Sequence, residues 1–148
     1  ITIDQLRQRM HRALSPDGQH RMVVFQGETL EHIARWLGVR VQDIRRWNRL
    51  KSSALHIGQR LKLQFSSVSP QEFTERRFRY HWEKLPRAYR TARQFFLRPY
   101  IVQNGQTLSH IAARHPEITV NILLYFNEFH KLRRMQEGDI INFIEIIK

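Results

Sequence analysis

The sequence predicts an α+β protein in which two small βααβ units are linked by a helical connector and preceded by an amphipathic helix. The main observation is an internal repeat: Gly-Glu-Thr-Leu-Glu-His-Ile-Ala at residues 27–34 recurs as Gly-Gln-Thr-Leu-Ser-His-Ile-Ala at residues 105–112. An apolar run precedes each copy, and an Asn, a Gly and an alternating apolar segment follow each. The stretch between the copies is rich in Arg and aromatic residues. We therefore expect four segments, at residues 1–18, 20–66, 69–98 and 99–148.

The first segment is the predicted N-terminal helix. Its apolar residues fall at helical spacing, and a Ser-Pro-Asp-Gly turn at residues 15–18 ends it; they are Ile3, Leu6, Met10 and Leu14. We expect this helix either to pack on the first repeat or to be the end of a domain upstream.

The first repeat predicts the order strand, helix, helix, strand. Residues 22–25 are an apolar run, and Thr29 stands where a helix N-cap is needed. Apolar residues then follow at helical spacing as far as Gly38, a natural helix stop. A second helix is expected at residues 41–48. The last strand is predicted from apolar residues that alternate with polar ones, namely Leu61, Leu63 and Phe65. The two strands can pair antiparallel.

The second repeat has the same landmarks in the same order. Thr107 corresponds to Thr29, Asn127 to Asn48, and a Gly at residue 138 precedes the final apolar segment. His32 and His110 share a repeat position, which indicates a surface or capping role common to both units.

The segment between the repeats predicts an ordered helical connector that fixes one repeat relative to the other. Ser-Pro-Gln-Glu at residues 69–72 is a capping box with Pro at the first helical position. Pro86 should break or kink the helix. One apolar stripe is formed by Phe78, Trp82, Leu85 and Tyr89. A flexible linker would instead be rich in Gly and Ser.

Composition limits the class of protein. A repeat of about 45 residues lies near the lower limit for independent folding, and with no Cys in the chain neither a disulfide nor a Cys-ligated zinc can help. The net charge of +12 indicates an anionic partner, such as peptidoglycan stem-peptide carboxylates, lipid head groups or nucleic acid. No run is long and apolar enough to span a membrane. Since the first residue is not Met, we interpret the chain as a fragment of a longer protein.

Residues 22–65 and 100–144 resemble the LysM (lysin motif) family. The family motif is a hydrophobic strand, Gly-Asp-Thr-Leu, Ile-Ala, an Asn closing the second helix, and Gly-x-x-Leu before the last strand. The first copy matches at Gly-Glu-Thr-Leu, Ile-Ala, Trp47-Asn48 and Gly58-Gln59-Arg60-Leu61. The second matches less closely, because Gln106 replaces the acidic residue and His115-Pro116-Glu117 stands where a short turn is expected.

The resemblance implies non-catalytic binding of N-acetylglucosamine-containing glycans, peptidoglycan in bacteria and chitin elsewhere. In the family, the groove lies between the Gly-x-Thr-Leu loop and the loop joining the second helix to the second strand. Carried over, the first groove comprises Gly27, Glu28, Thr29, Leu30, Lys51, Ala54, Leu55, His56 and Ile57. The second comprises Gly105, Gln106, Thr107, Leu108, Leu132, Met135 and Gln136. Such a module would anchor its protein in the periplasm or cell envelope of a bacterium.

Two other functions remain open. The connector could dock a protein partner of an envelope assembly, with degenerate LysM folds as scaffold, through Arg76, Phe78, Arg79, Trp82 and Tyr89. The same basic helix could bind nucleic acid or an anionic membrane, although nucleic acid is the weaker candidate. Salt dependence would separate phosphate-driven binding from hydrogen-bonded sugar binding.

An enzyme is not expected within these residues. Glycan cleavage needs a carboxylic acid in a cleft, usually opposed by a second carboxylate, and no such pair stands in an apolar setting here. There is no Cys nucleophile and no Gly-x-Ser-x-Gly elbow. No pair of His residues has the spacing of a helical zinc site, so neither a metal nor a cofactor is expected. A catalytic domain elsewhere in a longer chain remains compatible with the sequence.

Overall fold

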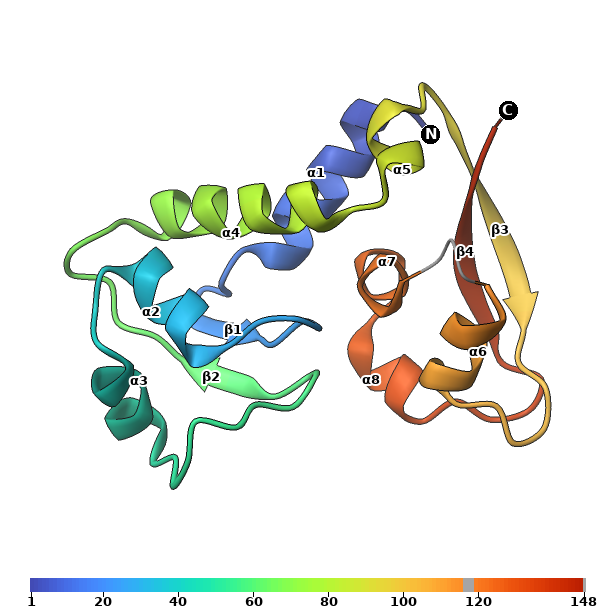
Figure 1. Cartoon of the computed structure of the whole chain (residues 1–148). Coiled ribbons are helices and arrows are strands. Elements are labelled where there is room, and N and C mark those ends of the chain that lie inside the picture. The colour runs from blue at the N-terminus through green and yellow to red at the C-terminus, as the bar shows by residue number, and fades with distance from the viewer. Residues whose placement is uncertain (116–118, 148) are drawn as a thin grey trace. The chain divides into compact units, whose positions relative to one another are not determined.

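The computed structural model describes residues 1–115 and 119–147 and confirms the α+β fold (Figure 1). The chain forms two compact units, one of Leu14–Lys84 and one that combines Ile1–Ala13 with Leu85–Lys148. Each unit contains one two-stranded antiparallel sheet and one copy of the repeat.

The unit of Leu14–Lys84 contains the first repeat in the predicted order. Strand β1 (Arg21–Val23) is followed by helices α2 (Leu30–Leu37) and α3 (Val41–Asn48), and then by strand β2 (Arg60–Lys62). Met22 pairs with Leu61 in the centre of the sheet. The core gathers side chains from all four elements, among them Met22, Leu30, Ile33, Leu37, Ile44 and Leu61.

The second strand of this unit is shorter than predicted. Leu63 and Phe65 continue the apolar alternation, but β2 ends at Lys62. The reason lies in the partner strand, where His20 has a φ of 58° and turns the chain before β1 begins at Arg21. The amide of Leu63 still donates to the carbonyl of His20 at 2.8 Å, and its side chain is buried.

Helix α4 (Pro70–Lys84) completes this unit. It starts at the predicted capping box, where Ser69 and Glu72 exchange side-chain and backbone hydrogen bonds. It packs against α2 (Figure 1). Its Phe73 side chain enters the core of the repeat. The first helix of the connector therefore adds buried apolar surface to a repeat that is small for a domain.

The other unit contains the second repeat and the N-terminal helix. Its elements are α1 (Ile3–Leu14, of which residues 3–13 belong here), α5 (Arg87–Thr91), β3 (Phe95–Ile101), α6 (Leu108–Arg114), α7 (Val120–Phe126), α8 (Phe129–Arg133) and β4 (Ile140–Ile146). Strands β3 and β4 pair from Phe95↔Ile146 to Ile101↔Ile140. Tyr89 of α5 stacks on Phe95 with ring centroids 5.9 Å apart.

Two features of this unit differ from the sequence prediction, and a third cannot be compared with it. The connector was expected to be helical to residue 98, but helix ends at Thr91 and β3 begins at Phe95. The cause is the long apolar run of β4, which offers pairing partners as far as Ile146. Helix α8 was not predicted and occupies part of the expected loop. Pro116 and Glu117, the site of an expected turn, lie outside the described residues.

The N-terminal helix groups with the second repeat rather than the first. The Ile1 ammonium donates to the carbonyl of Phe95 at 2.7 Å, and the amide of Phe95 donates to the carbonyl of Ile1 at the same distance. Arg9 lies over the ring of Phe126 at 5.2 Å. Of the two expected alternatives, packing on the first repeat or the end of a domain upstream, the first is corrected, because Ile1–Ala13 belongs to the unit of Leu85–Lys148.

Candidate functional site

The structure brings the two predicted loops of the first repeat together at one end of its sheet. Val24 donates to the carbonyl of Gln59 at 2.9 Å, and Gly58 donates to the carbonyl of Val24 at 2.8 Å. These bonds extend the β1–β2 pairing into the loops. Gly27 and Gly58 have φ values of 88° and 86°, in the left-handed region that favours glycine. The Gly-Glu-Thr-Leu loop and the loop before β2 therefore lie next to each other where they meet the two strands.

The residues predicted to line this first groove differ in their exposure. Exposed residues are Gly27, Thr29, Lys51, Ala54, His56 and Ile57, whereas Leu55 is half-buried. Ile57 keeps 38% of its surface exposed, which is unusual for a large aliphatic side chain in this unit. Leu30 is fully buried in the core and Glu28 is only 6% exposed. Leu30 can therefore offer a ligand its backbone alone, and the Glu28 side chain is directed elsewhere.

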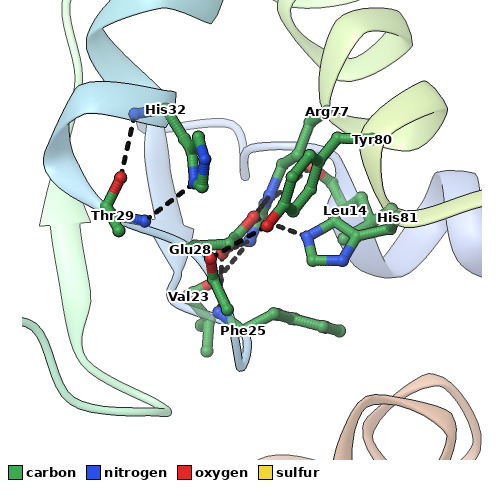
Figure 2. A network of polar contacts seen from close by, with 10 residues as sticks. Leu14, Val23, Phe25, Glu28, Thr29, His32, Arg77, Tyr80 and His81 are labelled. Atoms are coloured by element: carbon green, nitrogen blue, oxygen red, sulfur yellow. Dashed lines mark hydrogen bonds and ion pairs between the residues drawn. The ribbon is translucent and has the colours of Figure 1, made fainter. Parts of the chain in front are cut away.

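Thr29 and His32 cap helix α2 reciprocally (Figure 2). The Thr29 hydroxyl accepts from the amide of His32 at 3.1 Å, and the His32 Nδ1 accepts from the amide of Thr29 at 3.2 Å. Thr107 and His110 make the same two bonds at the start of α6. Of the surface or capping role expected for the shared His, the structure shows the capping role. It has the geometry of a capping box, with an imidazole in place of the usual Glu or Gln.

Glu28 lies at the centre of a buried polar network (Figure 2). Its carboxylate accepts from Arg77 Nε at 2.6 Å and Nη2 at 2.8 Å, and from the amide of Phe25 at 2.6 Å. His81 Nε2 lies 2.8 Å from Oε2 and acts as the donor, because an ionised carboxylate can only accept. Burial alone would raise the pKa of Glu28, but the Arg77 charge and the hydrogen bonds from His81 and Arg77 outweigh it and lower the pKa to about 2.

Helix α4 thus covers one side of the Gly-Glu-Thr-Leu loop. Besides Arg77 and His81, Tyr80 reaches the loop and donates its hydroxyl to the carbonyl of Gly27 at 3.0 Å. The Tyr80 ring packs on His32 at 4.7 Å between centroids. Burial, followed by the nearby Glu28 charge, raises the pKa of Tyr80. Sequence reasoning did not assign these three residues to the loop, since they are about fifty positions away and no local spacing reveals the contact.

The second repeat brings its two loops together in the same way. Val102 donates to Asp139 at 2.8 Å, and Gly138 donates to Val102 at 2.9 Å. Gly105 and Gly138 have left-handed φ values of 77° and 92°. Among the predicted groove residues, Gly105, Thr107 and Gln136 are exposed, Gln106, Leu108 and Met135 are half-buried, and Leu132 is buried. Leu132 belongs to the unexpected helix α8, which turns its side chain into the core.

Glu28 and Gln106 play the same backbone role in the two units. The Gln106 Oε1 accepts from the amide of Gln103 at 2.8 Å, as Glu28 Oε1 accepts from Phe25. Gln106 also accepts the Tyr100 hydroxyl at 3.0 Å. The position therefore closes the turn after the first strand. A charge is compatible with burial only in the first unit, where Arg77 of α4 neutralises it.

Asn48 and Asn127 fix the last strand of each repeat. The Asn48 amide donates to the carbonyls of Ile44 and Lys62, and its oxygen accepts from the amide of Lys62 at 2.6 Å. Asn127 makes the equivalent bonds to Leu123 and to both backbone groups of Asn142. The repeat identifies these two residues as landmarks of the motif. Their role could not be predicted, because it depends on a strand about fifteen residues further along the chain.

The predicted partner-binding residues do not form one exposed surface. Tyr89 is 1% exposed and Phe78 is 9% exposed, so the stripe is largely buried. Trp82 is half-buried and stacks on Phe78 at 5.8 Å. Arg76 and Arg79 are exposed and line a hollow between α2 and α4.

Among the described residues, no group of three or more His, Asp or Glu side chains is placed to hold a metal ion. Within the same part of the chain, every helix is too short or too polar to cross a membrane.

A scan against protein-family models matches the LysM domain at residues 23–64 and 100–142, which are the two repeats. A search of curated proteins found no match. LysM domains are binding modules rather than catalysts; they generally bind N-acetylglucosamine-containing glycans such as peptidoglycan or chitin, and they are typically extracellular or associated with cell walls. The two matches cover more than half of the chain and coincide with two units of the same loop geometry, and the chain therefore belongs to the LysM family.

Proposed function

We propose that this chain is a non-catalytic glycan-binding module that holds its parent protein to bacterial peptidoglycan in the cell envelope. The observation that carries the proposal is the repetition of one loop arrangement. In both units a left-handed Gly is followed by an N-capping Thr, and a second left-handed Gly donates its amide to the carbonyl of a Val, Val24 or Val102, just after the first strand. Both units belong to a family that binds N-acetylglucosamine polymers.

The first groove offers the groups that an N-acetyl group needs. An acetamide presents one N–H, one C=O and one methyl group. Loop backbone beside Gly27 and His56 can meet the polar groups, because a left-handed Gly without a Cβ lets a ligand approach closely. Ile57 supplies exposed apolar surface for the methyl group. The turn that presents Ile57 is held by His56 and Gln59, with the His56 amide donating to Gln59 Oε1 at 2.9 Å.

The second groove has the same frame but a different surface. Gln136 and Asp139 hold its turn as His56 and Gln59 hold the first, at 2.9 Å. Glu137 stands where the first unit has Ile57, so the apolar contact is missing. We propose that the first groove is the tighter site and that the second adds avidity on a polymer. Each groove alone should bind weakly, because it lies on exposed loops.

The test is co-sedimentation of the chain with purified peptidoglycan sacculi and with chitin, at low and at high salt. Retention at high salt on either polymer supports hydrogen-bonded sugar recognition. Binding that disappears at modest salt would contradict the proposal, because ionic attraction to a chain of charge +12 is screened by salt whereas sugar hydrogen bonds persist. Absence of binding to both polymers at low salt would overturn it outright.

A further inference from the structure

An open hollow of about 380 Å³ lies between α2 and α4, within the unit of Leu14–Lys84. Helix α2 contributes two of its lining residues and α4 contributes four that share one helical stripe; they are Arg35, Trp36, Arg76, Arg79, Tyr80 and Glu83. The family's groove uses neither helix face, so the hollow is separate from the two loops described above.

The hollow carries an excess of positive charge. Three arginines face one carboxylate, and Arg35 and Arg79 form no ion pair with any residue that the structure describes. Arg76 is held in place, because Nη1 donates to the carbonyl of Trp36 at 3.2 Å while Nη2 lies 4.0 Å from the Glu72 carboxylate. Cations without counter-charges in a hollow raise the local concentration of anions.

The walls of the hollow are rigid and aromatic. Trp36 and Tyr80 lie 5.4 Å apart between ring centroids. Trp36 is only 7% exposed and packs edge-on against Phe73 of the core. Tyr80 is tied to the carbonyl of Gly27. A ligand entering the hollow would therefore meet apolar surface that is held by the core, beside the guanidinium groups.

Tyr80 also links the hollow to the first glycan groove. Its ring lines the hollow, and its hydroxyl contacts Gly27, the first residue of the groove loop. The same side chain therefore borders both the loop where a sugar would bind and the hollow that holds the arginines. A neutral glycan such as chitin has no peptide branch, whereas the sugars of peptidoglycan carry peptides that end in carboxylates.

We propose that this hollow binds a carboxylate of the peptide attached to the glycan, so that the chain prefers acidic, peptide-bearing polymers over neutral ones. The proposal rests on the proposed function and gives it a ligand class. Arg35 and Arg79 would take the carboxylate, since guanidinium forks bind carboxylates through paired hydrogen bonds. Trp36 and Tyr80 would pack on the adjacent carbon chain. Glu83 would disfavour a second carboxylate or bind an amine of the same peptide.

The test compares three soluble probes by calorimetry: a neutral chitin oligosaccharide, a peptide-bearing disaccharide, and the same glycopeptide with its carboxylates amidated. The full chain should bind the acidic glycopeptide on the order of tenfold more tightly than the amidated one, as expected for a charged hydrogen bond. The variant Arg35→Gln/Arg79→Gln should lose this preference and keep its affinity for the chitin oligosaccharide.

The matched control is Arg60→Gln/Lys62→Gln, which removes the same charge from exposed positions of the same unit away from the hollow. Its preference for the acidic probe should remain. Equal loss in the control, or equal affinity of wild type for the acidic and amidated probes, would overturn the hollow as a carboxylate site. The chitin oligosaccharide reports separately on the groove: if it does not bind but the acidic preference persists, the groove fails and the hollow stands.

Discussion

Glu28 and Arg77 form a buried bidentate ion pair although they are 49 positions apart in the sequence. Both side chains are fully shielded from solvent. Arg77 also donates to the carbonyls of Val23 at 2.6 Å and Leu14 at 2.8 Å. The pair therefore joins α4 to the Gly-Glu-Thr-Leu loop and to the end of β1. It makes the connector helix a structural part of the first LysM unit.

Replacing Glu28 with Gln should destabilise the first unit by about 3 kcal/mol, because Arg77 is left buried without a counter-charge. Urea unfolding followed by Trp fluorescence measures this unit alone, since Trp36, Trp47 and Trp82 all lie within it. A double-mutant cycle with Arg77→Met should give a coupling free energy of about 2 kcal/mol.

Glu72→Gln is the control for that cycle. Glu72 faces Arg76 on the same helix, but both side chains are about half exposed, and Gln preserves the capping box. The Glu72→Gln substitution should lower the free energy of unfolding by less than about 1 kcal/mol. A cost for Glu28→Gln as small as that of Glu72→Gln would contradict the structural role of the buried pair.

Acid should destabilise the first unit over a defined range. The pKa of Glu28 is lowered from 4.5 to about 2, so its contribution is complete above pH 4.5 and is lost as the pH falls towards 2. The full loss corresponds to about 3.5 kcal/mol at about 1.4 kcal/mol per pKa unit. Asp17 and Asp43 also have lowered pKa values, through backbone hydrogen bonds. The difference between wild type and Glu28→Gln therefore isolates Glu28, and unfolding curves between pH 2 and 6 should converge at the acid end.

The local features of each repeat could be predicted from the sequence because their causes are local. Thr29 caps a helix whose first amides lie two or three residues away, and Gly38 ends it in a left-handed conformation at φ 70°. Helix α3 also has the predicted bounds, because the spacing of its own apolar residues determines where the helix forms. The shared His was expected to have a surface or a capping role because it recurs at the same repeat position, and the structure shows the capping role.

Features that depend on distant partners could not be predicted. Glu28 was assigned to the glycan groove by its position in the motif, and only α4 shows that its carboxylate is taken by Arg77 and His81. Phe95 follows a helical, Arg-rich stretch, and only its pairing with Ile146 places it in a strand. For the same reason, removal of residues 100–148 would divide β3 and leave Phe95 without its partner.

Substituting Ala for Asn48 or Asn127 should lower the free energy of unfolding of the corresponding unit by about 1–3 kcal/mol. The reason is that backbone groups of Lys62 or Asn142 in the last strand lose their hydrogen-bond partners. Amide hydrogen exchange should accelerate at Lys62 in the first variant and at Asn142 in the second. Asn104→Ala, in an exposed loop, is the matched control and should change neither. Unchanged exchange in both Asn variants would mean that the strands hold without this bridge.

Ile57→Ser should weaken binding of a chitin oligosaccharide about tenfold while leaving the fold intact. Ile57 is the large exposed apolar residue of the proposed first groove, and burying a side chain of its size contributes about 1.5–3 kcal/mol. Leu97→Ser is a matched control, since Leu97 has the same 38% exposure but lies in β3 of the other unit. Gly27 is a poorer target, because its φ of 88° would strain any other residue and confound binding with folding. Calorimetry with the oligosaccharide should show weaker binding by the Ile57→Ser variant than by the Leu97→Ser variant. If both variants bind as tightly as wild type, Ile57 does not contact the sugar, and the first groove must be assigned to other residues.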